Sequence, residues 1–181
     1  KQVVAVDVGY GLLHERVAGD PRVEVRDRTN VRDLVLDEPV DLVVADLSFI
    51  SLRTVLPALL GAARPGATMV LLVKPQFEAT REEADRGRGV IRDPAVWRRV
   101  LHEVEDALRA RGAAIMGAMV SPLHGADGNV EFVLHVRAPS PGDPGSDHGD
   151  GDRDGAGTPG DHPIDRHPGL DVDALVREAT G

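Results

Sequence analysis

The sequence predicts an α/β fold in which helices flank a mostly parallel sheet, with an antiparallel pair of strands at one edge. Two observations carry this prediction. Continuous apolar and β-branched runs alternate with helix-like segments, which is typical of parallel strands buried on both faces. The last two strand-like runs are separated only by a turn, so they are expected to pair antiparallel.

The individual elements follow from local patterns. Apolar, β-branched runs predict strands over residues 3–8, 22–26, 41–46, 68–73, 113–120 and 130–137. Amphipathic spacing predicts helices over residues 12–18, 52–63 and 94–111. The last of these helices has Asp93 as its N-cap, Pro94 in its first turn and Gly112 as its stop. Residues 78–89 are mostly charged and are interrupted by glycines, so this stretch is expected to be a loop.

A change in composition near Ala138 divides the chain into a body over residues 1–138 and a tail over residues 139–181. In residues 139–169, 21 of 31 positions are Pro, Gly or Asp, so this stretch cannot bury enough apolar surface to offset its ordering entropy and should be disordered. Its histidines (His148, His162 and His167) could be interpreted as a metal site, but without a rigid frame we expect a solvated tail and no metal. Residues 170–180 could form a short helix.

Charge and hydropathy limit the classes of partner. Of the net charge of −9, residues 139–181 carry −7, so the body is close to neutral and an anionic partner such as RNA is not excluded. The absence of cysteine fits a reducing cytoplasm, where we expect the protein to be located. No apolar run approaches the roughly 20 residues that span a bilayer, so no membrane partner is expected. Nothing in the sequence indicates an oligomeric state.

Polar residues at the ends of the predicted strands are the candidate site, because ligands of open α/β sheets bind outside the carboxyl ends of the strands. Asp7 and Gly9 follow the first strand. The carboxylate could accept hydrogen bonds from ribose hydroxyls while the glycine lets backbone approach a ligand, or the aspartate could cap a tight turn. Thr29 and Asn30 follow the second strand and could meet an adenine edge or form a turn.

A second set of strand ends supplies a lysine and two carboxylates. Asp46 ends the third strand, Lys74 follows the fourth, and Glu131 opens the last strand between apolar neighbours. A lysine beside a proline at the end of an apolar strand is unusual for a purely structural residue. If the three side chains converge, they could serve proton abstraction or substrate positioning, or form a plain buried ion pair.

Four segments of the chain resemble a known enzyme family. VVAVDVGYG, VVADLSFISL, LVKPQFE and SPLHGADGNVEF are similar, in order and spacing, to the haemolysin-A-like (TlyA) family of ribosomal RNA methyltransferases, which are relatives of the FtsJ-type ribose 2'-O-methyltransferases. The resemblance runs from residue 1 to about residue 137. It implies a class I (Rossmann-like) S-adenosylmethionine-dependent methyltransferase fold that acts on the ribose of a nucleotide, by family habit cytidine, in ribosomal RNA or a ribosomal subunit.

The resemblance also implies roles for the strand-end residues. Asp46, Lys74 and Glu131 match three positions of the family's Lys-Asp-Lys-Glu catalytic set, in which the lysine takes or steers the proton of a ribose 2'-hydroxyl. Asp7 and Gly9 would hold the ribose of S-adenosyl-L-methionine, and Thr29 and Asn30 would face its adenine, with Asp46 also close to the cofactor. The family requires no metal.

Several family features lie upstream of residue 1. They are the first catalytic lysine, the glycine-rich cofactor loop, the strand before that loop and a small RNA-binding domain. The missing strand belongs between the strands that end at Asp7 and Asp46, so we expect a gap there with unpaired backbone groups on both sides. This absence predicts that the chain is a fragment. A second chain that supplies the strand is the alternative.

Two other functions compete with methyl transfer. The family name suggests a haemolytic, membrane-active protein, which would need an amphipathic or apolar membrane segment that the sequence does not show. The other is an inactive methyltransferase fold that serves as a binding module.

Five arginines could contact RNA phosphates or simply form a solvated face; they are Arg86, Arg88, Arg92, Arg98 and Arg99.

Overall fold

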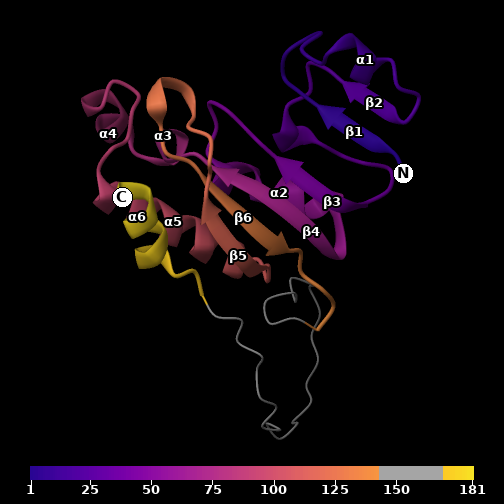
Figure 1. The fold of residues 1–181 in the computed structure, drawn as a ribbon. Coiled ribbons are helices and arrows are strands. Elements are labelled where there is room, and N and C mark those ends of the chain that lie inside the picture. Colours follow the sequence, from indigo (N-terminus) through magenta and orange to yellow (C-terminus); the bar gives the residue numbers. More distant parts are fainter. Residues whose placement is uncertain (143–168) are drawn as a thin grey trace, which may run out of the picture.

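The computed structural model describes residues 1–142 and 169–181 and shows the predicted α/β fold (Figure 1). The strands are β1 (Val3–Val6), β2 (Val23–Arg26), β3 (Val40–Ala45), β4 (Ala63–Val73), β5 (Ala114–Val120) and β6 (Phe132–Arg137). The α-helices are α1 (Glu15–Ala18), α2 (Leu52–Ala62), α3 (Pro75–Glu78), α4 (Arg81–Arg86), α5 (Pro94–Arg109) and α6 (Val172–Thr180). Two short 3₁₀ turns are η1 (Val31–Asp33) and η2 (Ala126–Gly128).

The larger sheet has the strand order β3-β4-β6-β5. β3 and β4 are parallel, whereas β6 runs antiparallel to both of its neighbours, β4 and β5. β3, β4 and β5 therefore share one direction, which confirms the antiparallel edge pair that the short turn between the last two strands predicts. β1 and β2 form a separate parallel pair.

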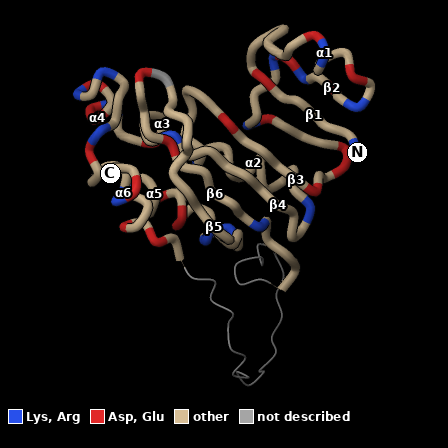
Figure 2. Tube along the Cα trace, viewed as in Figure 1, with Lys and Arg blue, Asp and Glu red and all other residues tan. Residues whose placement is uncertain are grey.

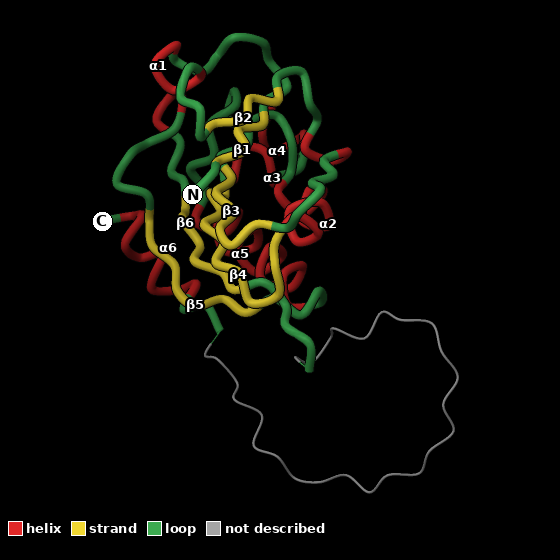
Figure 3. The backbone as a smooth tube through the Cα atoms, turned by 90° about the vertical axis from the view of Figure 1, so that its right-hand side faces the viewer, coloured by secondary structure: helices red, strands yellow, loops and turns green. Residues whose placement is uncertain are grey.

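The expected gap lies between β1 and β3. Within residues 1–142 and 169–181, β1 pairs only with β2, and no strand pairs with β3 on the side opposite β4. Figures 1 and 3 agree that the β1-β2 pair lies beyond the β3 edge of the larger sheet. The backbone N–H and C=O groups along the facing edges of β1 and β3 are thus without strand partners in the described chain.

The hydrophobic core occupies one face of the larger sheet. Alternate strand residues such as Met69, Leu71 and Leu134 are buried against α2, α5 and α6. Residues of the opposite face are more open: Val44 is 69% and Met119 is 48% exposed. The charged positions gather on the helices and loops and leave the strands mostly uncharged (Figure 2).

Helix α5 supplies the largest part of the helical layer. Its buried residues recur every three to four positions, as an amphipathic helix requires. The members of this face are Val96, Trp97, Val100, Leu101, Val104, Glu105 and Leu108. Asp93 accepts a hydrogen bond from the backbone N–H of Ala95, and Pro94 opens the first turn, as the sequence predicts.

The prediction of a loop over residues 78–89 is wrong in part, because this stretch contains the last residue of α3 and the whole of α4. Thr80 and Glu83 form a capping box, in which the Thr80 hydroxyl accepts from the Glu83 backbone N–H and the Glu83 carboxylate accepts from the Thr80 backbone N–H. Two other boundaries differ from the prediction by more than two residues. Helix α1 begins at Glu15 instead of residue 12, and β4 begins at Ala63 instead of residue 68, because Ala63 already pairs with Val40 of β3.

Helix α6, near the end of the chain, packs against α5 and β5 and contributes Val172, Leu175 and Val176 to the core. Arg98 of α5 donates to Asp173 at 2.8 Å, and Glu105 accepts from the backbone N–H of Leu170 at 3.1 Å. The division of the chain at residue 138 stays a prediction, and the stretch 143–168, with His148, His162 and His167, lies outside the described residues. Among the described helices, none has both the length and the apolar character needed to cross a bilayer.

We predict that Leu175→Ala lowers the free energy of unfolding by about 2–5 kcal/mol, because Leu175 is only 6% exposed and its truncation would leave a cavity under α6. Glu178→Ala, on the exposed face of the same helix, is the matched control and should change it by less than about 0.5 kcal/mol. Urea denaturation followed by circular dichroism measures both. Equal stability of the two variants would show that α6 is not part of the folded core.

Candidate active site

The topology of the larger sheet brings three predicted site residues to one edge. Asp46 and Lys74 follow the parallel strands β3 and β4, so both lie at the carboxyl ends of these strands. Glu131 precedes β6, which is antiparallel to β4, and Phe132 pairs with Val73. The start of β6 therefore lies beside the end of β4.

Lys74 lies between the two carboxylates. Its Nζ is 2.6 Å from Asp46 Oδ1 and 4.0 Å from Glu131 Oε1, and it also donates to Ser48 Oγ at 3.3 Å. The two acids differ in environment, because the Asp46 side chain is 68% exposed and that of Glu131 only 8%. Glu131 thus faces the Lys74 amine from the buried side, whereas the Asp46 carboxylate stays accessible to a ligand.

The single turn of α3 joins the loops that carry these residues. Gln76 Nε2 donates to Glu131 Oε1 at 3.0 Å, and the Phe77 ring lies 5.2 Å from that of Phe49, centroid to centroid. Glu78 is buried, and its carboxylate accepts hydrogen bonds from Ser51 Oγ at 2.6 Å and from the backbone N–H of Leu52 at the start of α2. The sequence singles out this segment only by family resemblance and does not indicate the contacts of Gln76 and Glu78.

An ion-pair network fixes α3 and α4 to the helices beneath them. Arg53 of α2 donates to Glu78 at 2.9 Å and to Glu103 of α5 at 2.6 Å. Arg99 joins Glu103, at 2.7 Å, to Glu83 of α4, at 2.6 Å. The backbone N–H of Thr80, with a smaller contribution from Arg99, holds the pKa of Glu83 below its usual range, and the hydrogen bond to Glu103 raises the pKa of Arg99. Both groups are therefore stabilised in their charged forms.

The loop before β6 shapes the space around Glu131. A Cβ on Gly125 would overlap Glu131 Oε1 and lie 2.8 Å from its Cδ, so the glycine leaves room for the carboxylate. Asn129 is 3% exposed; its Oδ1 accepts from the backbone N–H of Ile91 and its Nδ2 donates to the carbonyl of Gly89, both at 3.0 Å. These bonds tie the loop of Glu131 to the segment that leads into α5.

The predicted cofactor residues form a second group at the ends of β1 and β2. Asp7 Oδ1 accepts from the backbone N–H of Gly9 at 2.7 Å, and its carbonyl accepts from that of Thr29 at 2.9 Å. Asn30 Oδ1 accepts from the backbone N–H of Arg32 at 3.0 Å and so caps η1. Asp7 thus does cap a tight turn, and its side chain remains exposed.

The two groups stay apart in the described chain. No hydrogen bond or ion pair links Asp7, Gly9, Thr29 or Asn30 to Asp46, Lys74 or Glu131 among the described residues. Both groups nevertheless lie at the carboxyl ends of parallel strands, on either side of the gap. Among the described residues, no group of three or more histidines and carboxylates is arranged to hold a metal ion.

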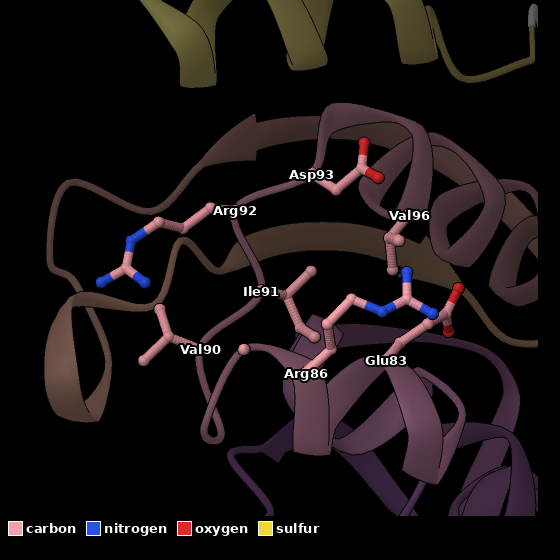
Figure 4. Close-up of a pocket in the computed structure, with 8 residues that line it drawn as sticks. Glu83, Arg86, Val90, Ile91, Arg92, Asp93 and Val96 are labelled. Carbon is pink, nitrogen blue, oxygen red and sulfur yellow. The ribbon is translucent and has the colours of Figure 1, made fainter.

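A shallow pocket lies between α4 and the start of α5 (Figure 4), and Lys74 is not among the residues that line it. Its lining includes Arg86, Ile91, Arg92 and Val96, and the Arg92 side chain extends away from the pocket. Two of the five arginines named from the sequence, Arg86 and Arg92, therefore line this pocket.

Three of these arginines have acidic partners. Arg98 pairs with Asp173, Arg99 with Glu83 and Glu103, and Arg86 with Glu82 at 3.2 Å. In the part of the chain that the structure describes, Arg88 and Arg92 form no ion pair, and both are exposed.

Comparison with known proteins assigns the family. Residues 1–138 match the model of the FtsJ-like methyltransferase family. The chain is 49% identical over 138 residues to the 16S/23S rRNA (cytidine-2'-O)-methyltransferase TlyA of Mycobacterium tuberculosis, a match that covers 75% of this chain and 51% of that protein. The chain spans about half the length of the curated relatives it matches.

Solved structures agree with this assignment. A protein of Lactococcus lactis described as a candidate hemolysin superposes with a TM-score of 0.79 at 28% identity, over 100% of this chain and 77% of that one. The N-methyltransferase NodS of Bradyrhizobium japonicum, in complex with S-adenosyl-L-homocysteine, superposes with a TM-score of 0.51 at 18% identity, over 77% of this chain and 67% of that one, and so shows the fold alone. With the family match spanning every strand described here, the chain has the class I methyltransferase fold and belongs to the FtsJ-like methyltransferase family.

Proposed function

We propose that the protein that carries this chain transfers a methyl group from S-adenosyl-L-methionine to the 2'-hydroxyl of a ribose, with cytidine as the nucleotide, in ribosomal RNA. The observation that carries the proposal is the position of Lys74 between Asp46 and Glu131 at the strand ends of an FtsJ-like methyltransferase. The name of the Mycobacterium tuberculosis relative supplies the substrate class.

When bound, the cofactor supplies an electrophilic methyl group on a sulfonium. Asp7 would accept hydrogen bonds from its ribose, Gly9 would allow the backbone to approach, and Thr29 and Asn30 would lie along its adenine. Asp46, on the other side of the gap, has the exposure needed to reach the same ligand.

Lys74 would steer the 2'-oxygen toward the methyl group and take or direct the hydroxyl proton as the new O–C bond forms. Asp46 and Glu131 hold the amine from two sides, so its direction is set before the substrate arrives. Such positioning of reacting groups accounts for a large share of the rate enhancement in displacement reactions of this kind.

Phe49 offers a surface for the base of the target nucleotide. The side chain is 91% exposed, its backbone has φ of 63°, and its ring is supported by Phe77. Ser48, the preceding residue, contacts Lys74. An exposed aromatic ring beside the reacting amine suits a base that has left its stack, as proteins that read single-stranded RNA require.

Arg88 and Arg92 would contact the phosphates that flank this nucleotide. They are the exposed arginines of the five that lack an acidic partner in the described chain, and the hydrogen bonds of Asn129 to Gly89 and Ile91 fix their segment beside the loop of Glu131. A cation without an acidic partner loses no ion pair when it binds a phosphate, so these two positions suit RNA better than Arg98 and Arg99.

Lys74→Ala should lower the rate of ribose methylation by roughly 100-fold or more, since it removes the group that directs the hydroxyl proton. The assay is transfer of tritiated methyl groups to ribosomal RNA by the full-length protein that carries this chain. Arg64→Ala, an exposed cation on the other end of β4, is the control and should retain the parental rate. S-adenosylmethionine affinity, measured by calorimetry, should not change in either variant. A Lys74→Ala protein as fast as its parent would refute the proposed site.

The double variant Arg88→Gln/Arg92→Gln should weaken RNA binding and reduce the slope of log K against log salt by roughly 1 to 2, because each lost phosphate contact removes about 0.7 from the slope for a single strand. Fluorescence anisotropy of a short single-stranded RNA at several KCl concentrations gives the slope. Arg98→Gln should leave it unchanged, since Arg98 is paired with Asp173. An unchanged slope in the double variant would place the RNA elsewhere.

A further inference from the structure

We propose that Gln76 is a positioning residue that holds the Glu131 carboxylate toward Lys74. This inference rests on the proposed function and gives a role to Gln76, which lies in the segment LVKPQFE but outside the Lys-Asp-Lys-Glu set. Gln76 acts through Glu131 and does not itself touch the substrate.

The contact between the two side chains is direct. Gln76 Nε2 donates to Glu131 Oε1 at 3.0 Å, and this same oxygen lies 4.0 Å from Lys74 Nζ. Glu131 is 6% exposed, so its carboxylate takes most of its contacts from protein groups. The oxygen that faces the lysine is therefore the one that Gln76 fixes.

Gly125 also lies against the carboxylate. A methyl group on Gly125 would overlap Glu131 Oε1, which means that its backbone lies against the carboxylate with no room to spare. The amide of Gln76 thus sets the direction of Glu131, and the Gly125 backbone limits its movement.

The other atom of the Gln76 amide has no protein partner in the described chain. Among the described residues, Gln76 Oε1 is the buried side-chain N or O atom without a hydrogen bond. A carboxylate only accepts hydrogen bonds, so the N–H group must face Glu131 and the oxygen must point away. The bond to Glu131 therefore fixes the orientation of the whole amide, although this leaves the oxygen without a protein partner among the described residues.

The backbone of Gln76 is itself fixed. α3 follows Lys74 directly, so the lysine and the amide belong to one short turn. Glu78, at the end of that turn, is bound to Ser51 and to the first residue of α2, Leu52. The turn that carries Gln76 is thus anchored to α2, while the pairing of Val73 with Phe132 brings Glu131 beside Lys74.

The test is a double-mutant cycle between Gln76 and Glu131 in the full-length protein that carries this chain. Gln76→Met keeps the length of the side chain and removes its N–H donor, and should lower kcat for RNA methylation roughly 10- to 100-fold, as misplacement of a catalytic group does. KM for RNA and the affinity for S-adenosylmethionine should stay within about twofold, because neither ligand contacts Gln76. Gln76→Glu, of the same shape, serves if the methionine variant does not fold, and should be at least as slow.

The decisive readout is the same change in a Glu131→Gln background. Once the carboxylate is gone there is nothing to orient, so Gln76→Met should cause no further loss of kcat there. Losses that multiply, or a Gln76→Met protein with parental kcat, would overturn the role of Gln76 and leave the proposed function intact. A Glu131→Gln protein with parental kcat would instead refute the proposed role of Glu131, and with it this inference.

Discussion

The site depends on the buried contact between Glu78 and the beginning of α2. A helix N-terminus carries backbone N–H groups without partners and a partial positive charge, both of which a carboxylate satisfies. Glu78 is 4% exposed and is bound by Leu52, Ser51 and Arg53, so its charge is fully compensated. The contact joins the loop after β3 to the loop after β4, and these two loops carry Asp46 and Lys74. Loss of Glu78 would leave Arg53 partly buried beside the start of α2 and free both loops to move.

The antiparallel direction of β6 brings Glu131 to the pair of Lys74 and Asp46. Because β6 is antiparallel to β4, the residue that opens β6 meets the residue that follows β4, and a buried carboxylate reaches the lysine from beneath. Asp46 reaches the same lysine from the exposed side. The two acids therefore have different parts in the proposed reaction. The buried Glu131 can only hold the amine, whereas the exposed Asp46 can also contact a ligand.

The gap between β1 and β3 separates the two halves of the proposed site. Asp7, Gly9, Thr29 and Asn30 lie on the β1-β2 side, and the lysine with its carboxylates lies on the other. Methyl transfer requires the cofactor to reach both, so the spacing of the two sheets decides whether the site can work. In residues 1–142 and 169–181, the facing edges of β1 and β3 are unpaired, so the described chain does not fix that spacing by the backbone hydrogen bonds of a continuous sheet.

The sequence by itself determined the strands, the main helices and the residues at the strand ends, because apolar periodicity reports burial and caps such as Asp93 and Pro94 act locally. For this reason Asp46, Lys74 and Glu131 could be named in advance. Only the tertiary structure decided which distant groups meet. Glu78 binds Leu52 across 26 residues, Gln76 binds Glu131 across 55, and Arg98 binds Asp173 across 75. A local pattern carries no information about such partners, since they are brought together by the order and direction of the strands.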